Sequence, residues 1–384
     1  MTYGIRFNRN EWSGAFGDIG TDLPLIIGML LATDLNAANV LIGFGVLQIL
    51  TGLVYRIPMP VQPLKAVAMI VIAGEIPGAV IAGGSLAIGA IMLLLTATGL
   101  LMVLARTIPK PVVRGIQMGL GIQLSLVALK DYLPSLGWSG YALALIGFSI
   151  GVVLLGNRRY PPAIPILLTG VLFAFVVPSG DSISFSLSLP VLAAPDLSWQ
   201  VILTGLVVLA LPQIPLSLGN SILATHQLAS DYFPERKITI NKIGWTYSIL
   251  NLVTPFTGGI PVCHGSGGIA GHYTFGGRTG GSTIIYGLFY VVLGLFFSSA
   301  PSYALSLFPK PTLGVILLFE GMVLILLVKD IITDRKVFFI AVLVALLAVG
   351  LPSGYLIGML VGTTLYYLRN RGVLSHAGHR DSDH

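Results

Sequence analysis

Long apolar stretches follow one another along almost the whole chain, separated by short polar or glycine-rich segments. A helix of about 20 apolar residues crosses a hydrocarbon core of about 30 Å. The pattern therefore predicts an all-α polytopic membrane protein with about fourteen transmembrane segments. The expected spans lie near residues 13–33, 38–55, 60–74, 84–105, 111–129, 139–156, 162–178, 198–229, 241–256, 263–276, 282–300, 311–328, 336–350 and 352–368.

The composition and the placement of charges agree with this arrangement. Hydrophobic residues make up 55% of the 384 residues and charged residues only 9%, whereas about a quarter of a soluble protein is charged. If the N-terminus is cytoplasmic, every basic residue except Lys65, Lys130 and Lys310 lies on that side, which is 18 of 21. We therefore expect a multi-pass protein of the cell (inner) membrane with both termini in the cytoplasm. In a soluble protein a net charge of +6 would suggest binding to nucleic acid. In a membrane protein the membrane explains this charge better.

The sequence contains a weak internal repeat. Three short motifs recur in the same order at offsets that drift from 191 to 203 residues: 23–25 with 214–216, 57–63 with 260–266, and 109–111 with 309–311. An odd number of spans in each repeat inverts the second copy, which places Lys110 inside and Lys310 outside, as the charge pattern requires. We expect two inverted repeats of seven spans, 1–180 and 198–370, followed by a short cytoplasmic tail, 371–384.

Two weak spans, the third and the tenth, occupy equivalent positions in these repeats. Pro58, Pro60 and Pro63 prevent a continuous helix in the first of them. The second lies in 258–281, where ten of 24 residues are glycine, and each glycine weakens a helix by about 1 kcal/mol relative to alanine. Such backbone persists at membrane depth only where protein buries it or where it lines a cavity. We expect two half-helices, starting near Pro63 and His264, whose N-termini face each other and favour an anion.

Polar side chains of other spans are expected to gather around this point. Asp18 and Asp22 are four residues apart and share a helical face in the first span. Gln213, Ser217 and Asn220 form a polar stripe in the eighth span, where two prolines should kink or unwind the helix. The candidate substrate-binding residues are Gln62, Lys65, Gln213, Ser217, Asn220, Cys263, His264, Gly265, Ser266 and Gly267, and the candidate proton-coupling residues are Asp18, Asp22 and Glu320.

Each assignment has a structural alternative that the sequence leaves open. Residues 21–24 predict a helix start, in which Asp22 would only cap a helix. In the alternative for Lys65, its side chain extends toward the membrane interface and does not contact a ligand. In the alternative for the polar stripe, its side chains form hydrogen bonds between helices. In the alternative for Glu320, the side chain has a structural role or connects domains and does not contact the substrate.

The charge balance at the expected site favours a divalent oxyanion that is taken up with protons. Two half-helix ends supply about +1 in total, and a protonated Lys65 supplies about +1 more. Asp18 or Asp22 would oppose anion binding unless it were protonated, so we expect a carboxylate to take up a proton as the anion arrives.

Enzyme and metal chemistry are disfavoured. The chain has one cysteine, and its position beside one histidine matches no familiar zinc spacing. Residues 265–267 do not match the Gly-x-Ser-x-Gly elbow of serine hydrolases. We expect neither an enzyme activity nor a cofactor.

Four segments, 16–24, 58–65, 213–221 and 259–268, strongly resemble the molybdate transporter family of the sulfate permease superfamily. The resemblance covers nearly the whole chain and implies a seven-plus-seven inverted-repeat fold like that of the uracil permease. It implies a core domain and a gate domain that move against each other to give alternating access, often within a homodimer. The core would comprise spans 1–4 and 8–11 (13–105 and 198–300), and the gate spans 5–7 and 12–14 (111–178 and 311–368).

The resemblance also implies which residues contact the substrate and which domain is missing. Only about fifteen residues follow the last span, so we expect no cytoplasmic regulatory domain like that of sulfate permeases. By the same resemblance, the residues that would face the substrate cavity are Asp18, Gln62, Lys65, Gln213, Asn220, His264 and Ser266.

We therefore expect a secondary active transporter that imports a tetrahedral divalent oxyanion, molybdate or also sulfate, with protons. The expected partners are that oxyanion, protons, the lipid bilayer and a second copy of the chain, but not nucleic acid. One alternative is an anion channel or uncoupled conductance at the same site. Another is a permease for a monovalent anion or a nucleobase. A nucleobase is disfavoured because neither half-helix opening has a carboxylate to accept its ring N–H groups.

Overall fold

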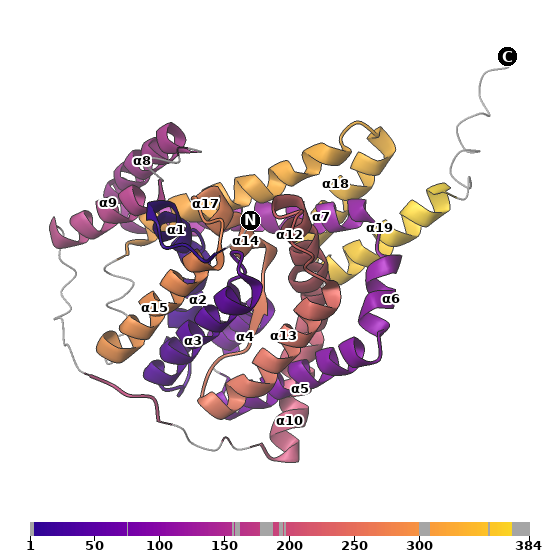
Figure 1. Cartoon of the computed structure of the whole chain (residues 1–384), viewed down its shortest axis with the longest axis horizontal. Coiled ribbons are helices and arrows are strands. Elements are labelled where there is room, and N and C mark those ends of the chain that lie inside the picture. The colour runs from indigo at the N-terminus through magenta and orange to yellow at the C-terminus, as the bar shows by residue number, and fades with distance from the viewer. Residues whose placement is uncertain are drawn as a thin grey trace.

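Helices form nearly all of the regular structure in the computed structural model (Figure 1). The structure describes residues 4–74, 76–155, 157, 162–176, 187–191, 195, 197–298, 308–351 and 354–370. Parts of four expected spans (156, 177–178, 299–300 and 352–353) and the whole expected tail (371–384) lie outside these residues.

The elements labelled η are short 3-10 or π-helical segments. In the first half of the chain the elements are α1 (Arg9–Ala15), α2 (Ile19–Leu31), α3 (Ala37–Tyr55), β1 (Val61–Pro63), α4 (Lys65–Gly74), α5 (Gly78–Ala97), α6 (Leu100–Thr107), α7 (Lys110–Val127), η1 (Ala128–Tyr132), η2 (Leu133–Leu136), α8 (Gly137–Leu154) and α9 (Ala163–Val176). In the second half they are α10 (Trp199–Gly205), η3 (Leu206–Ala210), α11 (Leu211–Leu216), η4 (Ser217–Ala224), α12 (Thr225–Tyr232), α13 (Ile240–Val253), η5 (Thr254–Thr257), β2 (Val262–His264), α14 (Ser266–Thr274), α15 (Gly280–Phe297), α17 (Lys310–Leu326), η6 (Leu327–Ile331), α18 (Arg335–Gly350) and α19 (Gly354–Asn370).

The helices are those of a multi-pass membrane protein, although they do not fix the number of spans. Each expected span contains a helix. Within the described residues, five helices are long and apolar enough to cross a membrane, or seven if each of two bent helix pairs is one span. The count of fourteen therefore remains a prediction.

Two expected element boundaries were wrong. The chain does not start a helix at 21–24, because α2 has already begun at Ile19 and the N–H groups of Thr21 and Asp22 both donate to Asp18 O, at 3.0 and 3.1 Å. The expected fourth span, 84–105, is two helices, since Gly99 lies between α5 and α6 with a φ of 75°. Glycine adopts this left-handed conformation readily, whereas other residues seldom do.

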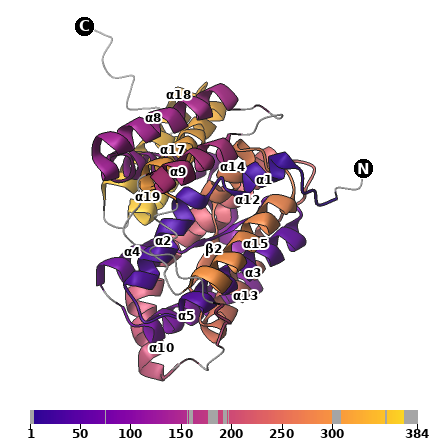
Figure 2. The same cartoon turned by 90° about the vertical axis from the view of Figure 1, so that its left-hand side faces the viewer.

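The helices form two groups that lie side by side. Helices α8, α9, α17, α18 and α19 gather in the upper part of both views, and α3, α5, α10, α13 and α15 lie below them (Figures 1 and 2). In the lower group α3 packs along α15 and α5 along α13. In the upper group α7 packs against α17 and α18, α8 against α9, and α18 against α19.

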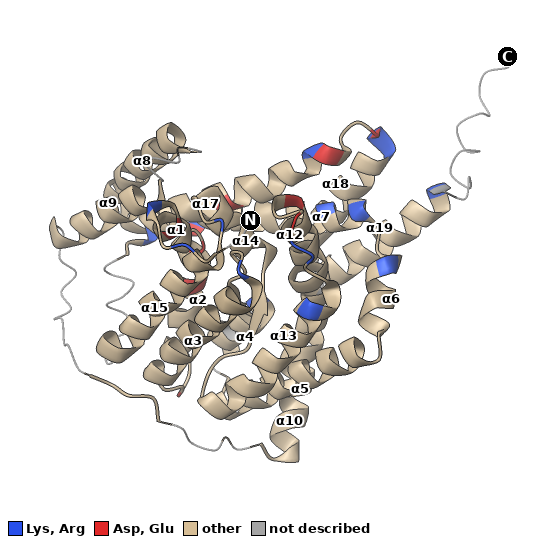
Figure 3. Ribbon diagram, in the orientation of Figure 1, with Lys and Arg blue, Asp and Glu red and all other residues tan. Residues whose placement is uncertain are grey.

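Charged residues are distributed unevenly over this framework. In Figure 3 the lysines, arginines and acidic residues lie mainly in the upper half of the view. Helices α3, α5, α10 and α15 contain no charged residue along their whole length. Uncharged apolar helices of this kind are suited to the hydrocarbon core of a bilayer.

The strands β1 and β2 are short, and they hold the centre of the molecule together. They pair in antiparallel register, with Val61 opposite His264. On the side away from this pairing, the Gln48 side chain accepts from Val61 N at 3.0 Å and donates to Val61 O at 2.8 Å. In the same way, the Asn251 side chain accepts from Val262 N at 3.0 Å and donates to Val262 O at 2.7 Å. Both amide side chains are fully buried, so each strand has its outer backbone groups satisfied by one side chain.

Replacing Gln48 with leucine should destabilise the protein, because the N–H and C=O groups of Val61 would remain buried without partners. Each such group costs about 1–3 kcal/mol, so we expect a loss of about 2–6 kcal/mol. A lower midpoint of thermal unfolding in detergent measures this effect. Gln200→Leu, which changes an exposed glutamine on α10, is the matched control. Equal midpoints for the two variants would contradict the proposed role of Gln48.

Candidate functional site

Two half-helices begin beside the paired strands at the centre of the molecule. The strand β1 leads into α4, which starts at Lys65, and β2 leads into α14, which starts at Ser266. Both starts lie two residues beyond the expected ones. In the register of the strands Gln62 is opposite Cys263. Side chains of directly opposed residues lie on the same face of an antiparallel pair, so Gln62 and Cys263 share one face and His264 lies on the other.

A buried amide and a buried carboxylate meet on the Gln62 face. The Nε2 atom of Gln62 lies 2.8 Å from both Asp18 Oδ1 and Asp18 Oδ2. Glu320 approaches the same region from α17, and its Oε2 accepts a hydrogen bond from Thr21 at 3.2 Å. All three of the side chains Asp18, Gln62 and Glu320 are fully buried. The structure therefore brings together side chains from α2, β1 and α17.

The glycines at the start of α14 make room for these side chains. A Cβ atom at Gly268 would lie 2.6 Å from Asp18 Oδ2. A Cβ atom at Gly265 would overlap Gln62 Oε1, and one at Gly267 would overlap Glu320 Oε1. The sequence analysis named Gly265 and Gly267 as candidate substrate-binding residues, which stays a prediction. In the structure the three glycines admit two carboxyl groups and an amide directly at a helix N-terminus.

The polar stripe of the eighth span reaches the first turn of both half-helices. Gln213 Oε1 accepts from the Ala66 N–H of α4 at 3.0 Å. Asn220 Oδ1 accepts from the Ser266 hydroxyl of α14 at 2.7 Å. Ser217 lies between them, 3.2 Å from Gln213 Nε2 and 2.6 Å from the Tyr247 hydroxyl. The helix pair that carries the stripe is bent by 51°, as its prolines predict.

Lys65 lies between this site and a cavity. It lines a cavity of about 320 Å³ together with residues of α7, α11, α18 and α19, among them Gln123 and Tyr355. Its Nζ atom is buried and has no hydrogen-bond partner among the described residues. The Lys65 charge interacts with the carboxyl groups of Asp18, Asp22 and Glu320.

Several other buried atoms of the site lack partners. Within the described part of the chain, no hydrogen bond is made by Gln62 Oε1, Asp22 Oδ1 or Glu320 Oε1. Buried polar atoms are nearly always paired with protein or water, so an exception shared by neighbouring side chains indicates a place where a ligand or a proton completes the pairing.

His264 lies on the face opposite Gln62, and Asp22 contacts α15 through one of its carboxyl oxygens. The His264 ring has Nε2 2.9 Å from Thr246 Oγ1 and Nδ1 3.4 Å from Pro60 O, and it packs edge-on against Tyr55. Asp22 Oδ2 accepts from the Tyr286 hydroxyl at 3.2 Å. These contacts give His264 a role in holding β2, and they connect Asp22 to α15.

The sequence analysis missed the two amides that hold the strands. Asn251 follows Gln48 by 203 residues, the same offset that aligns 57–63 with 260–266. That offset would have found the pair if buried amides had been included in the search for repeats. It also missed Tyr286, because nothing in the local pattern distinguishes this tyrosine from other aromatic residues of an apolar helix.

Solved structures of anion transporters share this fold. The transmembrane domain of a cyanobacterium bicarbonate transporter, BicA, is 20% identical, with a TM-score of 0.54 and coverage of 90% of this chain and 98% of that chain. Murine Slc26a9 in the inward-facing state is 15% identical, with a TM-score of 0.59, and the match covers 94% of this chain and 68% of that chain.

Sequence comparisons give the family. The profile described as "Molybdate transporter of MFS superfamily" matches residues 10–124 and 205–324, which contain every candidate site residue. Molybdate transporters 1 and 2 of Arabidopsis thaliana are each 32% identical, over 94% of this chain and 89% and 87% of their own lengths. Molybdate transporter 1 of Chlamydomonas reinhardtii is 27% identical, over 91% of this chain and 90% of its own length. The chain belongs to the molybdate transporter family.

Proposed function

We propose that this protein is a secondary active transporter that imports molybdate, with sulfate as an alternative substrate, together with protons. The observation that carries the proposal is the pair of half-helices at β1 and β2, beside which Lys65 Nζ is buried without a hydrogen-bond partner among the described residues. Membership of the molybdate transporter family supports the choice of substrate.

The anion would bind at the N-termini of α4 and α14. Each helix N-terminus carries roughly +0.5 of an elementary charge and presents unpaired N–H groups. Ser266 and Gln62 would add polar contacts, and the Lys65 ammonium would supply the full positive charge. A tetrahedral oxyanion suits such a set because its four oxygens accept hydrogen bonds from several directions at once.

Proton coupling would follow from the carboxyl groups around that position. If Asp18, Asp22 and Glu320 were all ionised, three negative charges would face the single positive charge of Lys65. Two unit charges about 5 Å apart interact by about 3 kcal/mol at an effective dielectric constant of about 20, and a divalent anion would double each repulsion. Binding would therefore require protonation of at least one carboxyl group, so protons and anion would travel together.

The inverted repeat is supported by the way in which helices pack. In that repeat α3 would correspond to α13 and α5 to α15, so the packing of α3 on α15 is the equivalent of the packing of α13 on α5. The amides Gln48 and Asn251, which are 203 residues apart and hold the outer edges of β1 and β2, are related in the same way.

Alternating access would be a movement between a core domain and a gate domain. The core would comprise 13–105 and 198–300, and the gate 111–178 and 311–368. The grouping of helices in Figures 1 and 2 supports this division. The cavity beside Lys65 is lined by α4 and α11 on one side and by α7, α18 and α19 on the other, so a movement between the domains would open or close it.

Uptake into proteoliposomes tests the function directly. An inward proton gradient, acidic outside, should drive accumulation of radiolabelled molybdate above its external concentration, because the carboxyl groups would be loaded with protons on the outside. Equal rates with and without the gradient would contradict proton coupling. Large currents without uphill accumulation would indicate a channel instead.

Two lysine variants serve as a matched pair in this assay. Lys65→Ala should abolish accumulation because it removes the buried positive charge of the site. Lys130→Ala, at an exposed position on η1, should transport normally.

Gly267→Ala should weaken molybdate binding, since its Cβ atom would take up space at the start of α14, where the anion is proposed to bind, and would overlap Glu320 Oε1. Loss of one hydrogen bond to the charged anion costs about 1.5–3 kcal/mol, or roughly tenfold to a hundredfold in affinity. Titration calorimetry on the purified protein measures the change. Gly43→Ala is the control, because the nearest atom to its Cβ would lie 3.9 Å away. Unchanged binding by Gly267→Ala would show that this position lies outside the site.

A further inference from the structure

A buried polar chain leads from Asp22 away from the substrate site. Asp22 Oδ2 accepts from the Tyr286 hydroxyl at 3.2 Å, and the Tyr286 and Tyr290 hydroxyls are 3.1 Å apart. Asp22 and both tyrosines are fully buried. Binding of an anion at α4 and α14 makes no use of Tyr286, which lies on α15.

His272 continues this chain. It is fully buried near the end of α14, and its ring packs edge-on against that of Tyr286, with centroids 5.5 Å apart. Its Nδ1 atom lies 3.2 Å from the Ser282 hydroxyl oxygen. Its Nε2 atom has no hydrogen-bond partner among the described residues. A fully buried imidazole is costly in a membrane protein unless it has a role, and a free Nε2 leaves this one able to accept or donate a proton.

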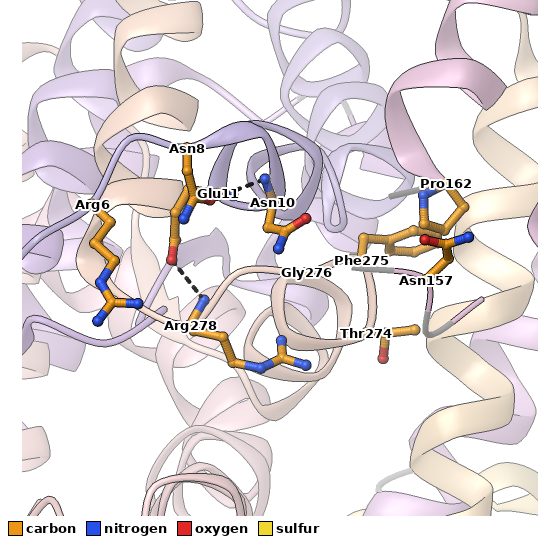
Figure 4. A pocket seen from close by; sticks show the side chains of 10 residues that line it. All are labelled: Arg6, Asn8, Asn10, Glu11, Asn157, Pro162, Thr274, Phe275, Gly276 and Arg278. Atoms are coloured by element: carbon orange, nitrogen blue, oxygen red, sulfur yellow. Dashed lines mark hydrogen bonds between the residues drawn. The ribbon is translucent and has the colours of Figure 1, made fainter. Parts of the chain in front are cut away.

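The chain ends at Glu11, which is buried beside a cavity. Glu11 Oε2 accepts from Ser282 N at 3.1 Å, and Glu11 Oε1 accepts from the backbone N–H groups of Arg278 and Thr279 at 3.1 and 3.0 Å. Glu11 also lines a polar cavity of about 330 Å³, shown in Figure 4 with Arg6 and Arg278 on its wall. In the orientation that the charge pattern of the sequence predicts, this cavity would lie on the cytoplasmic side.

Close backbone packing encloses the chain on its way to that cavity. A Cβ atom at Gly17 would overlap the carbonyl group of Gly271, and one at Gly14 would overlap the backbone of Gly277. The segment between α1 and α2 therefore lies directly on α14 beside His272. The cavity that Lys65 lines is formed by residues of other helices, α4, α7, α11, α18 and α19.

We propose that His272 relays the coupled proton from Asp22 to the cavity at Glu11, along a route separate from that of the anion. The proposal rests on the proton coupling proposed above. Asp22 would give its proton to the Tyr286 oxygen as the Tyr286 hydroxyl proton moves to His272 Nε2. A rotation of the ring or one water molecule would close the gap between them. His272 would then release a proton from Nδ1 to the Ser282 oxygen, as the Ser282 hydroxyl turns from Thr279 O, to which it donates at 3.2 Å, and gives its own proton to Glu11. A flip of the imidazole ring would return His272 to its starting tautomer, and the other intermediate groups would end with the protons they began with.

His272→Gln tests the relay, because glutamine retains polar atoms of similar reach but does not carry a proton. Three measurements on proteoliposomes and purified protein separate the steps: molybdate binding, molybdate exchange at equal pH on both sides, and uptake driven by a proton gradient. We expect binding and exchange to persist, while gradient-driven uptake falls by roughly a hundredfold, the scale of positioned proton transfer. His226→Gln, which changes a half-buried histidine of α12 whose ring contacts Ile238 O, should leave all three unchanged.

A second variant distinguishes loss of the relay from a folding defect. Tyr286→Phe keeps the ring and removes the hydroxyl, so it should show the same selective loss. Gradient-driven uptake at the wild-type rate in both variants would overturn the relay. Loss of binding and exchange along with uptake would overturn it as well, by assigning His272 a structural role. A wild-type protein without gradient-driven uptake would instead refute the coupling itself, and the relay with it.

Discussion

Backbone that leaves the helical conformation within a membrane must find its hydrogen bonds inside the protein. In this chain the unwound segments before α4 and α14 satisfy one another by pairing as β1 and β2. Gln48 and Asn251 satisfy the outer edges of the pair. The pairing fixes where both half-helices begin, and the placement of every polar side chain around them depends on it.

This arrangement places opposite charges in one small volume. Helix N-termini and Lys65 favour an anion, whereas Asp18, Asp22 and Glu320 oppose one. Both charged sets are largely shielded from bulk water, since the carboxyl groups are fully buried and the Lys65 Nζ atom is buried as well. The conflict is relieved when protons and an anion are present together, and this gives a physical reason for coupling their transport. The distinct contacts of Asp22 with α15 would allow the proton to leave by its own route.

The sequence predicted the half-helices and the polar stripe because proline, glycine and i, i+4 spacing act locally. It did not predict the side on which His264 lies, since strands of three residues show no alternation and a shift of one residue reverses the face. It did not distinguish a glycine that admits a ligand from one, such as Gly267, that admits Glu320. Such distinctions depend on the packing of α14 against α17, which no local pattern records.

The central claim is that one anion binds between the two half-helices. Molybdenum scatters X-rays anomalously, so a crystal of the protein soaked with molybdate would locate the ion without assumptions about the site. The account predicts an anomalous peak between the starts of α4 and α14, in contact with Lys65 and Ser266. A peak only in the cavity lined by Arg6 and Arg278, with none at the half-helices, would contradict it.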